Sequence, residues 1–207
     1  MLDTTRFFFA QCSGMLPRIG VDGELYIGFL SGSAVRVARS VSLDTNGVPQ
    51  FSSLLTAATV DAGYSYAWFP GNFRVPRIAC IAVDPSDSKK VHAVWADKTN
   101  AVGSRVNVDL YWTMTEDATA TTVSWRTPEI IMGGESIEGD QFFPWIEKDA
   151  HGRLHFLFID GRRGRWAGAN PHDAANGINA RVDAPAPATL PSPCVGAERR
   201  NPARRTC

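Results

Sequence analysis

The stretch PWIEKDAHGRLHFLFID (residues 144–160) decides the fold, because its pattern occurs more than once in the chain. It consists of a short apolar strand, a turn and a second apolar strand. In the turn, the Asp149 side chain can accept backbone N–H groups and Gly152 can adopt a positive φ. Apolar residues occupy both faces of the second strand, as a sheet packed between two other sheets requires.

Two further copies of this pattern precede it. They are PRIGVDGELYIGF (residues 17–29), around Asp22, and a pair of strands within residues 81–97, around Asp84. The Asp positions recur about every 62–65 residues, a period within the range of one large propeller blade with its loops.

More strands follow the first two copies. We predict third strands at 34–40 and 106–113 and fourth strands near 54–60 and 123–131. No amphipathic helical pattern appears in residues 1–163. The sequence therefore predicts an all-β fold, and the repeat favours a partial β-propeller over a sandwich. We expect about three blades of four-stranded antiparallel sheet, with the third blade incomplete after its second strand.

Three segments carry a family resemblance, namely residues 82–97, 109–113 and 139–146. They resemble bacterial sialidase-like proteins with Asp-box (BNR) repeats, and the likeness covers roughly residues 15–163. The resemblance implies a propeller of the exo-alpha-sialidase or related glycoside hydrolase type. It also implies a glycan or sialoglycoconjugate as partner and a secreted or cell-surface location.

The Asp-box of this family is Ser/Thr-x-Asp-x-Gly-x-Thr-Trp, a turn between the third and fourth strands. Residues 42–47 keep its Ser, its Asp and a displaced Gly, with Phe51 as the aromatic residue. Residues 115–117 keep the first part, but Trp125 lies too far along the chain and the Gly is missing. These departures weaken the box and leave the repeat intact.

The resemblance also points to ligand-binding residues. Residues 73–76 (FRVP) match a sialidase motif whose Arg grips the sialic acid carboxylate, which makes Arg74 a substrate-binding candidate. A guanidinium fork suits a carboxylate, because it offers two parallel hydrogen bonds. Lys98 stands near the place of a second Arg, and Asp97 and Asp109 are the acid/base candidates. The alternative for Arg74 is a surface Arg paired with a carbonyl or an acid, and for Asp97 a turn role at a strand end.

Other polar and aromatic residues have competing interpretations. Asp140 and Gln141 precede the first strand of the third copy and are rim candidates of the same kind as Arg74. His92 and His155 share one register position, which favours packing or hydrogen bonding over a metal site. Trp145 and its aromatic neighbours at 142 and 143 suit a core better than a sugar platform.

A complete catalytic set cannot be assembled from these residues. Glycoside hydrolysis requires a nucleophile and a proton donor at a fixed separation, and the Tyr–Glu pair and the later arginines of the family have no match. We therefore expect this chain to be inactive by itself. The alternative is a non-catalytic extracellular propeller that binds carbohydrate or protein.

Charge, hydrophobic runs and cysteine spacing argue against several classes of binding partner. The formal net charge is zero, with 21 basic and 21 acidic residues, so no basic excess attracts nucleic acid. The apolar runs are too short to cross a bilayer. The cysteines at 12, 80, 194 and 207 lack the spacing of metal ligands. We expect no nucleic acid, membrane insertion, metal or cofactor.

The chain divides into two parts. Residues 1–163 are predicted to be the propeller fragment, and we read no signal peptide at its start. Residues 164–207 are rich in Ala, Pro and Arg and show no strand pattern, which predicts a disordered tail. Either a natural linker or a frame-shifted translation would account for this change.

Overall fold

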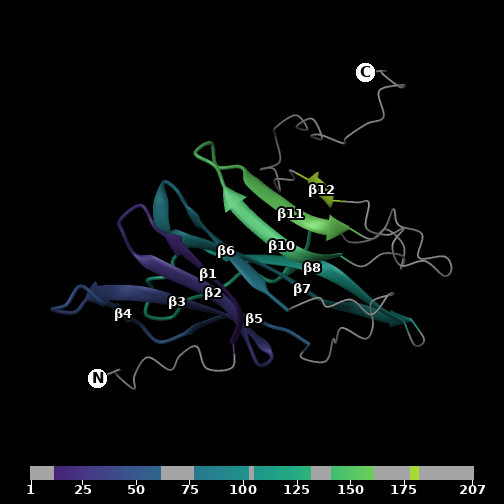
Figure 1. Ribbon diagram of the computed structural model, residues 1–207, viewed down its shortest axis with the longest axis horizontal. Helices are drawn as coiled ribbons and strands as arrows, with labels where there is room; N and C mark the ends of the chain where they lie inside the picture. Colours follow the sequence, from purple (N-terminus) through teal and green to yellow (C-terminus); the bar gives the residue numbers. More distant parts are fainter. Residues whose placement is uncertain (1–11, 62–76, 103–104, 132–140, 161–177, 182–207) are drawn as a thin grey trace.

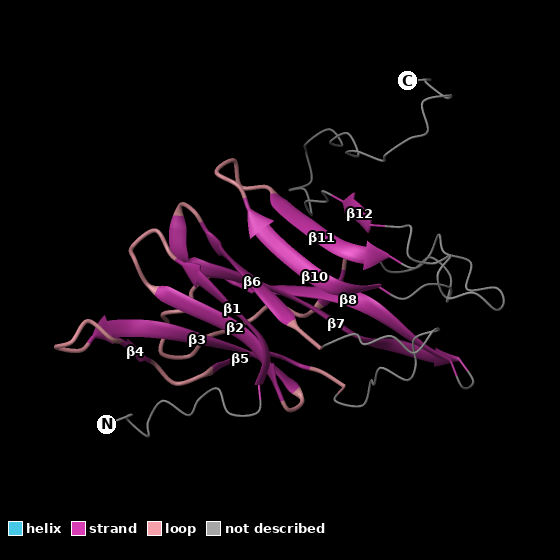
Figure 2. Cartoon of the chain, in the orientation of Figure 1, coloured by secondary structure: helices cyan, strands magenta, loops and turns pink. Residues whose placement is uncertain are grey.

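The structure is a computed structural model that describes residues 12–61, 77–102, 105–131, 141–160 and 178–181. All regular elements within these residues are β-strands, which confirms the predicted all-β class (Figures 1 and 2). In this part of the chain, no helix has the length and apolar character needed to cross a membrane.

The strands form three antiparallel sheets in chain order. Sheet I contains β1 (Cys12–Ile19), β2 (Leu25–Ser31), β3 (Ala34–Leu43), β4 (Pro49–Phe51) and β5 (Leu55–Thr59), and β3 pairs with both β4 and β5. Sheet II runs in the order β6 (Ala79–Asp84), β7 (Asp87–Val102), β8 (Arg105–Thr115) and β9 (Glu129–Ile130). Sheet III runs in the order β10 (Gln141–Lys148), β11 (Leu154–Asp160) and β12 (Ile178–Arg181).

The third and fourth strands predicted for the first two copies are confirmed, since β3, β5, β8 and β9 lie within or across the expected ranges. The prediction that residues 164–207 contain no strand is wrong at β12, and so is the expectation that the third sheet ends after two strands. β12 has only four residues, too few for a readable alternation. It forms because the edge of β11 offers unpaired backbone groups.

Sheets I and III begin in the same way. The β1–β2 turn is closed by Gly20 N–H donating to Glu24 O (2.8 Å), and the β10–β11 turn by Asp149 N–H donating to Arg153 O (2.9 Å). Each first strand also carries a bulge at the equivalent place, between Ser13 and Leu16 and between Phe142 and Trp145. The repeat read from the sequence is therefore a repeat of backbone conformation.

The Asp residues of this repeat need one correction. Asp84 and Asp149 accept the N–H groups two residues on, as expected. Asp22 does not, because Gly20 holds the equivalent position and the Asp22 carboxylate accepts the Ser88 hydroxyl of sheet II instead (2.5 Å). A Cβ at Gly20 would lie 2.6 Å from the Cβ of Ser88, so only glycine fits there.

The turn that follows β3 is built around the side chain of Asp44. Asp44, between β3 and β4, accepts the N–H groups of Asn46 and Val48, each at 2.8 Å. Gly47 closes this turn with a φ of 75°. Asp44 thus accepts turn amides at this hairpin, as Asp149 does between β10 and β11.

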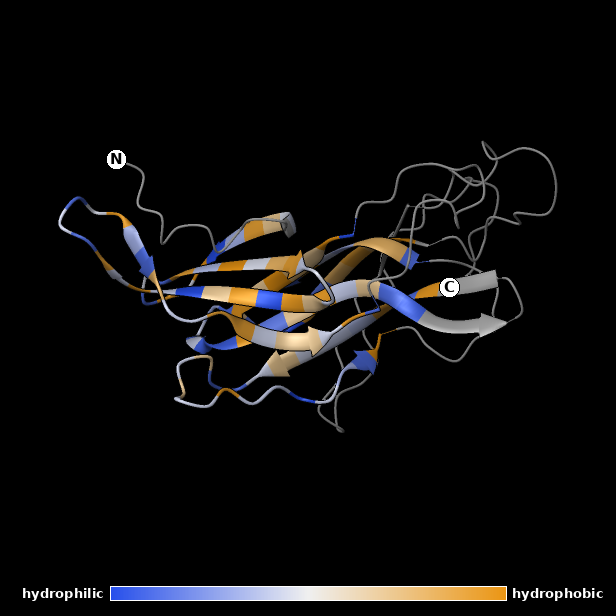
Figure 3. Cartoon of the chain, turned by 90° about the horizontal axis from the view of Figure 1, so that it is seen from below, coloured by the Kyte–Doolittle hydropathy of each residue, from blue (hydrophilic) through white to orange (hydrophobic). Residues whose placement is uncertain are grey.

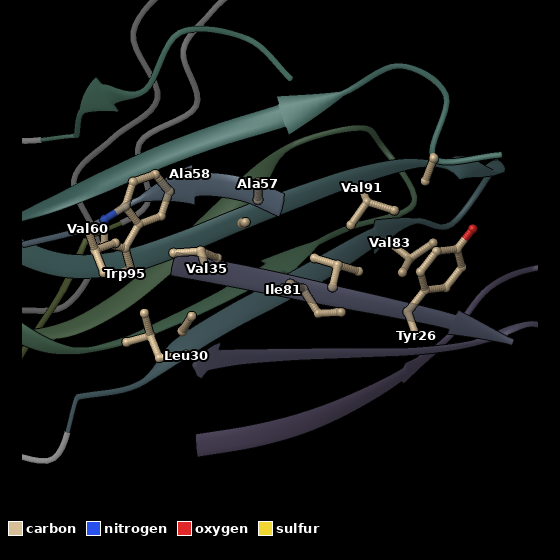
Figure 4. Close-up of a cluster of buried hydrophobic side chains, with 14 residues drawn as sticks. Tyr26, Leu30, Val35, Ala57, Ala58, Val60, Ile81, Val83, Val91 and Trp95 are labelled. Atoms are coloured by element: carbon tan, nitrogen blue, oxygen red, sulfur yellow. The ribbon is translucent and has the colours of Figure 1, made fainter. Parts of the chain in front are cut away.

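Two apolar cores separate the three sheets. Many of the strands carry hydrophobic residues, drawn in orange (Figure 3). The core between sheets I and II contains Trp95 and Ile81 of sheet II against Tyr26, Leu30 and Val35 of sheet I (Figure 4). The core between sheets II and III is formed by Cys80, Ala82, Val94, Ala96, Val108, Leu110, Trp112, Met114, Phe142, Ile146, Leu154, Phe156 and Phe158. Successive sheets are thus packed face to face.

We call the face of a sheet that looks toward the following sheet its forward face, and the opposite one its rear face. Side chains alternate between the two faces along each strand. On the second strands, the equivalent forward positions are Tyr26 and Gly28, His92 and Val94, and His155 and Leu157. On the first strands, the equivalent rear positions are Met15, Pro17 and Ile19, then Ala79, Ile81 and Val83, then Pro144, Ile146 and Lys148.

The three sheets fan out from their first strands. Stacked sheets lie about 10 Å apart, so the outer two of three parallel layers would be too distant for direct contact. Yet Arg18 of β1 lies 3.3 Å from Glu147 of β10, and its guanidinium lies over the Trp145 ring, 4.7 Å from the centroid. Side chains of the first strands of sheets I and III therefore meet beside β6, which both strands contact.

Candidate functional site

The candidate ligand-binding residues within the described part of the chain lie at one end of the sheets, where β6 and β10 begin. Asp97 and Asp109 are direct partners across β7 and β8, and Lys98 follows Asp97. Gln141 is the first residue of β10. We call this end the polar end. Arg74 and Asp140 lie outside the described residues.

Asp97 connects sheet II to sheet I. Its two carboxylate oxygens accept the N–H of Asp61, just after β5, at 3.2 and 3.0 Å, and one also accepts the N–H of Lys98 at 2.8 Å. Burial raises the pKa of Asp97, although these backbone hydrogen bonds oppose the shift. A raised pKa suits a proton donor, but both oxygens already hold backbone amides, which is typical of a positioning role.

The Lys98 side chain forms an ion pair with Asp61. Its ammonium lies 3.0 Å from a carboxylate oxygen of Asp61, and its side chain is 24% exposed. A ligand at the polar end can therefore reach Lys98, although it would compete with Asp61. The sequence did not predict this ion pair, because no pattern in the chain indicates that Asp61, just after β5, lies beside Lys98 of β7.

Asp109 is 7% exposed and lies opposite Asp97 on the rear face of sheet II. Two carboxylates at facing positions repel each other unless each is hydrogen-bonded or protonated. Below them, the rings of Trp95 and Tyr111 stack with centroids 5.9 Å apart. The carboxylate pair thus lies next to a stacked pair of aromatic rings on the same face.

Gln141 is almost fully buried, with 1% exposure. Its Oε1 has no hydrogen-bond partner among the described residues. It lies on the rear face of sheet III, which looks toward sheet II, because its cross-strand partner Asp160 continues the alternation of Phe156 and Phe158. Residues of both sheet II and sheet III thus form the polar end. No hydrogen bond in the described part of the chain joins Gln141 to the sheet II residues.

The opposite end of the sheets supports the structural interpretation of the repeated His position. Tyr26 donates its hydroxyl to Ser88 O of the next sheet (2.7 Å), and burial raises its pKa to about 12. His92 is 3% exposed, stacks on Trp112, and burial lowers its pKa to about 4. His155 contacts Asp149 of its own sheet (3.0 Å).

A buried ion pair joins sheets II and III beside His92. Lys148 Nζ contacts Asp84 Oδ2, and the two side chains are only 14% and 8% exposed. Burial alone would raise the pKa of Asp84, but hydrogen bonds from Lys148 and Ser86 hold it well below its ordinary value. This pair stabilises the junction between two sheets and lies away from the polar end.

The prediction that the aromatic residues at 142, 143 and 145 belong to a core holds for Phe142 and for Phe143, which is partly buried against that core, and fails for Trp145. Phe142 is buried in the core between sheets II and III, as expected. Trp145 is 41% exposed and carries Arg18 over its ring, so its assignment to the core is wrong. Sequence reasoning missed Arg18, whose partners lie about 130 residues away in the chain.

Among the described residues, no group of three or more His, Cys, Asp or Glu side chains is close enough to hold a metal ion. Cys80 is a buried free thiol that donates to Pro144 O. Comparison of the chain with family models, curated proteins and solved structures gave no match.

Proposed function

We propose that the chain forms three adjacent blades of a sialidase-like β-propeller. The contact of Arg18 with Glu147 and Trp145 supports a radial arrangement, because a flat stack of three sheets would keep β1 and β10 apart. The repeated turns and bulges of sheets I and III support it further.

On this basis the polar end binds a glycan. The observation that carries the proposal is the convergence of Asp109, Lys98 and Gln141 at one end of a fan of sheets. Propeller ligands bind where the first strands begin around the central channel. Buried carboxylates and amides with a nearby ammonium suit the hydroxyl and carboxylate groups of an acidic sugar.

A binding role is favoured over hydrolysis for this chain. The pKa of Asp97 is raised, as in a proton donor, but its carboxylate oxygens accept hydrogen bonds from the N–H groups of Asp61 and Lys98. A general acid must be free to meet the glycosidic oxygen. The second candidate function is therefore a non-catalytic carbohydrate-binding propeller, secreted or on a cell surface, and an exo-sialidase activity would require residues beyond those described.

The test measures binding and hydrolysis together. Isothermal titration calorimetry with a sialylated oligosaccharide should give saturable binding by the chain, and a fluorogenic sialoside should not be hydrolysed. Asp109→Asn and Arg74→Ala should each weaken binding by about tenfold or more, the value of one charge-assisted hydrogen bond. Asp87→Asn, at a partly exposed acid at the opposite end, is the control and should bind normally. Equal affinity of all four proteins, or no binding, would overturn the glycan site.

A further inference from the structure

The turn between β3 and β4 contains a chemically labile dipeptide, Asn46–Gly47. Both residues are exposed, and no atom outside their immediate neighbours lies within 4 Å of the place that a Cβ on Gly47 would take. This hairpin projects from the body of the three sheets (Figure 1). Because glycine has no side chain, its backbone nitrogen can approach the side-chain amide of the preceding asparagine. The turn therefore contains the groups needed for asparagine deamidation, which uses water as its only co-reactant.

Deamidation of this dipeptide proceeds in two steps. The Gly47 backbone nitrogen bonds to Cγ of Asn46 and gives up its proton, and the bond from Cγ to the side-chain nitrogen breaks, so that ammonia leaves with that proton. Water then opens the resulting five-membered imide at one of its two carbonyl carbons. The product is aspartate or, with one more carbon in the backbone, isoaspartate.

The closed turn opposes the first step. Gly47 N–H donates to Asp44 O (2.9 Å), and Asn46 N–H donates to Asp44 Oδ1 (2.8 Å). Val48 N–H donates to the same Oδ1, also at 2.8 Å. For the attack, the Gly47 nitrogen must release its proton and turn toward the Asn46 side chain, so its hydrogen bond to Asp44 O must break. The side chain of Asp44 therefore stabilises a conformation in which the reaction cannot start.

We propose that Asn46 is a deamidation site controlled by Asp44, which protects Asn46 in the closed turn and releases it when the turn opens. The hairpin suits local opening, because β4 has only three residues and pairs with β3. Such segments open without global unfolding. The product places a new carboxylate beside that of Asp44, and this repulsion opposes closure of the turn. Modification thus weakens the pairing of β4 with β3. The proposal does not depend on glycan binding.

Two substitutions at Asp44 separate hydrogen bonding from charge. Asp44→Ala removes the acceptor of two N–H groups, each worth about a two- to tenfold change in the population of the closed turn, so Asn46 should react about tenfold faster. Asp44→Asn keeps an acceptor oxygen without the charge, and its rate should stay within about threefold of the wild type.

The chain supplies its own reference, a second dipeptide of the same kind, Asn176–Gly177. Gly177 directly precedes β12 of sheet III, whereas the Asp44 turn belongs to sheet I. The reaction rate at Asn176 should therefore not respond to either substitution at Asp44. Equal acceleration at both sites would assign the effect of Asp44→Ala to global unfolding and would overturn the proposal.

Peptide mapping by mass spectrometry follows both sites in one sample of the full chain, incubated at physiological temperature and mildly alkaline pH. A parallel incubation in denaturing guanidinium chloride gives the rates without the turn. Wild-type Asn46 should react at least about tenfold more slowly in the folded protein, and Asp44→Ala should remove most of that protection. Equal rates at Asn46 in the folded and unfolded chain would overturn the proposal. So would a rate for Asp44→Ala equal to that of the wild type, or an acceleration by Asp44→Asn as large as that by Asp44→Ala.

Discussion

Gly28→Ala should destabilise the protein through one contact between sheets I and II. The new Cβ would lie 2.4 Å from Cγ2 and 3.0 Å from Cγ1 of Ile81, and the Ile81 side chain is fully buried. Overpacking of this kind costs about 1–3 kcal/mol, and the better strand propensity of alanine returns roughly 0.5–1 kcal/mol. We expect a net loss of about 1–2 kcal/mol in the free energy of unfolding.

The same substitution should have the opposite sign once Ile81 is shortened. Ile81→Ala alone should cost about 2–5 kcal/mol, because it leaves a cavity between the sheets. Adding Gly28→Ala to that variant should regain about 1 kcal/mol, since its methyl group enters the vacated space. Urea unfolding of the two single variants and the double variant completes the cycle. If Gly28→Ala were neutral in the wild type, or harmful in both backgrounds, the face-to-face packing of Gly28 on Ile81 would be refuted.

Substitutions at three further positions test the polar contacts. Lys148→Met should lower the free energy of unfolding by about 3 kcal/mol, because it leaves the Asp84 carboxylate buried without its partner. The wild type should lose about 3 kcal/mol as the pH falls from about 6.5 to about 4, because the unfolded state protonates His92 in that range and the folded state does not. His92→Phe should flatten this dependence in urea titrations at several pH values. Asp97→Ala should cost about 1–3 kcal/mol and Asp97→Asn less, since Asn retains one acceptor for the Asp61 amide.

A matched control separates these effects from general perturbation. Lys90→Met breaks an exposed ion pair with Asp87 and should change stability by less than about 1 kcal/mol. A Lys148→Met protein as stable as Lys90→Met would contradict the buried pair. A His92→Phe protein with the wild-type pH profile would assign the profile to another group.

The outcome for the candidate site was mixed. The family resemblance offered Asp97, Lys98 and Asp109 as candidates for one site, and the structure places Asp97 and Asp109 opposite each other across β7 and β8. The sequence could not predict that the Asp97 carboxylate accepts the N–H of Asp61. The two residues are 36 positions apart in the chain, and the contact joins sheet II to sheet I. The sequence also placed Trp145 in the core, because an aromatic residue in an apolar strand looks the same whether or not a sheet covers its face.

The sequence alone determined the strand class, the repeat and the turns. These depend on short-range chemistry: alternation along a strand, glycines with positive φ such as Gly152, and Asp side chains that accept amides two residues on. Only the tertiary structure decided how the sheets meet. Ser88 of the next sheet requires glycine at position 20, and its hydroxyl takes the Asp22 carboxylate away from the amides of its own turn. The approach of β1 to β10 depends on the contact of Arg18 with Glu147. Such contacts join residues more than 60 positions apart, so no local pattern in the chain can encode them.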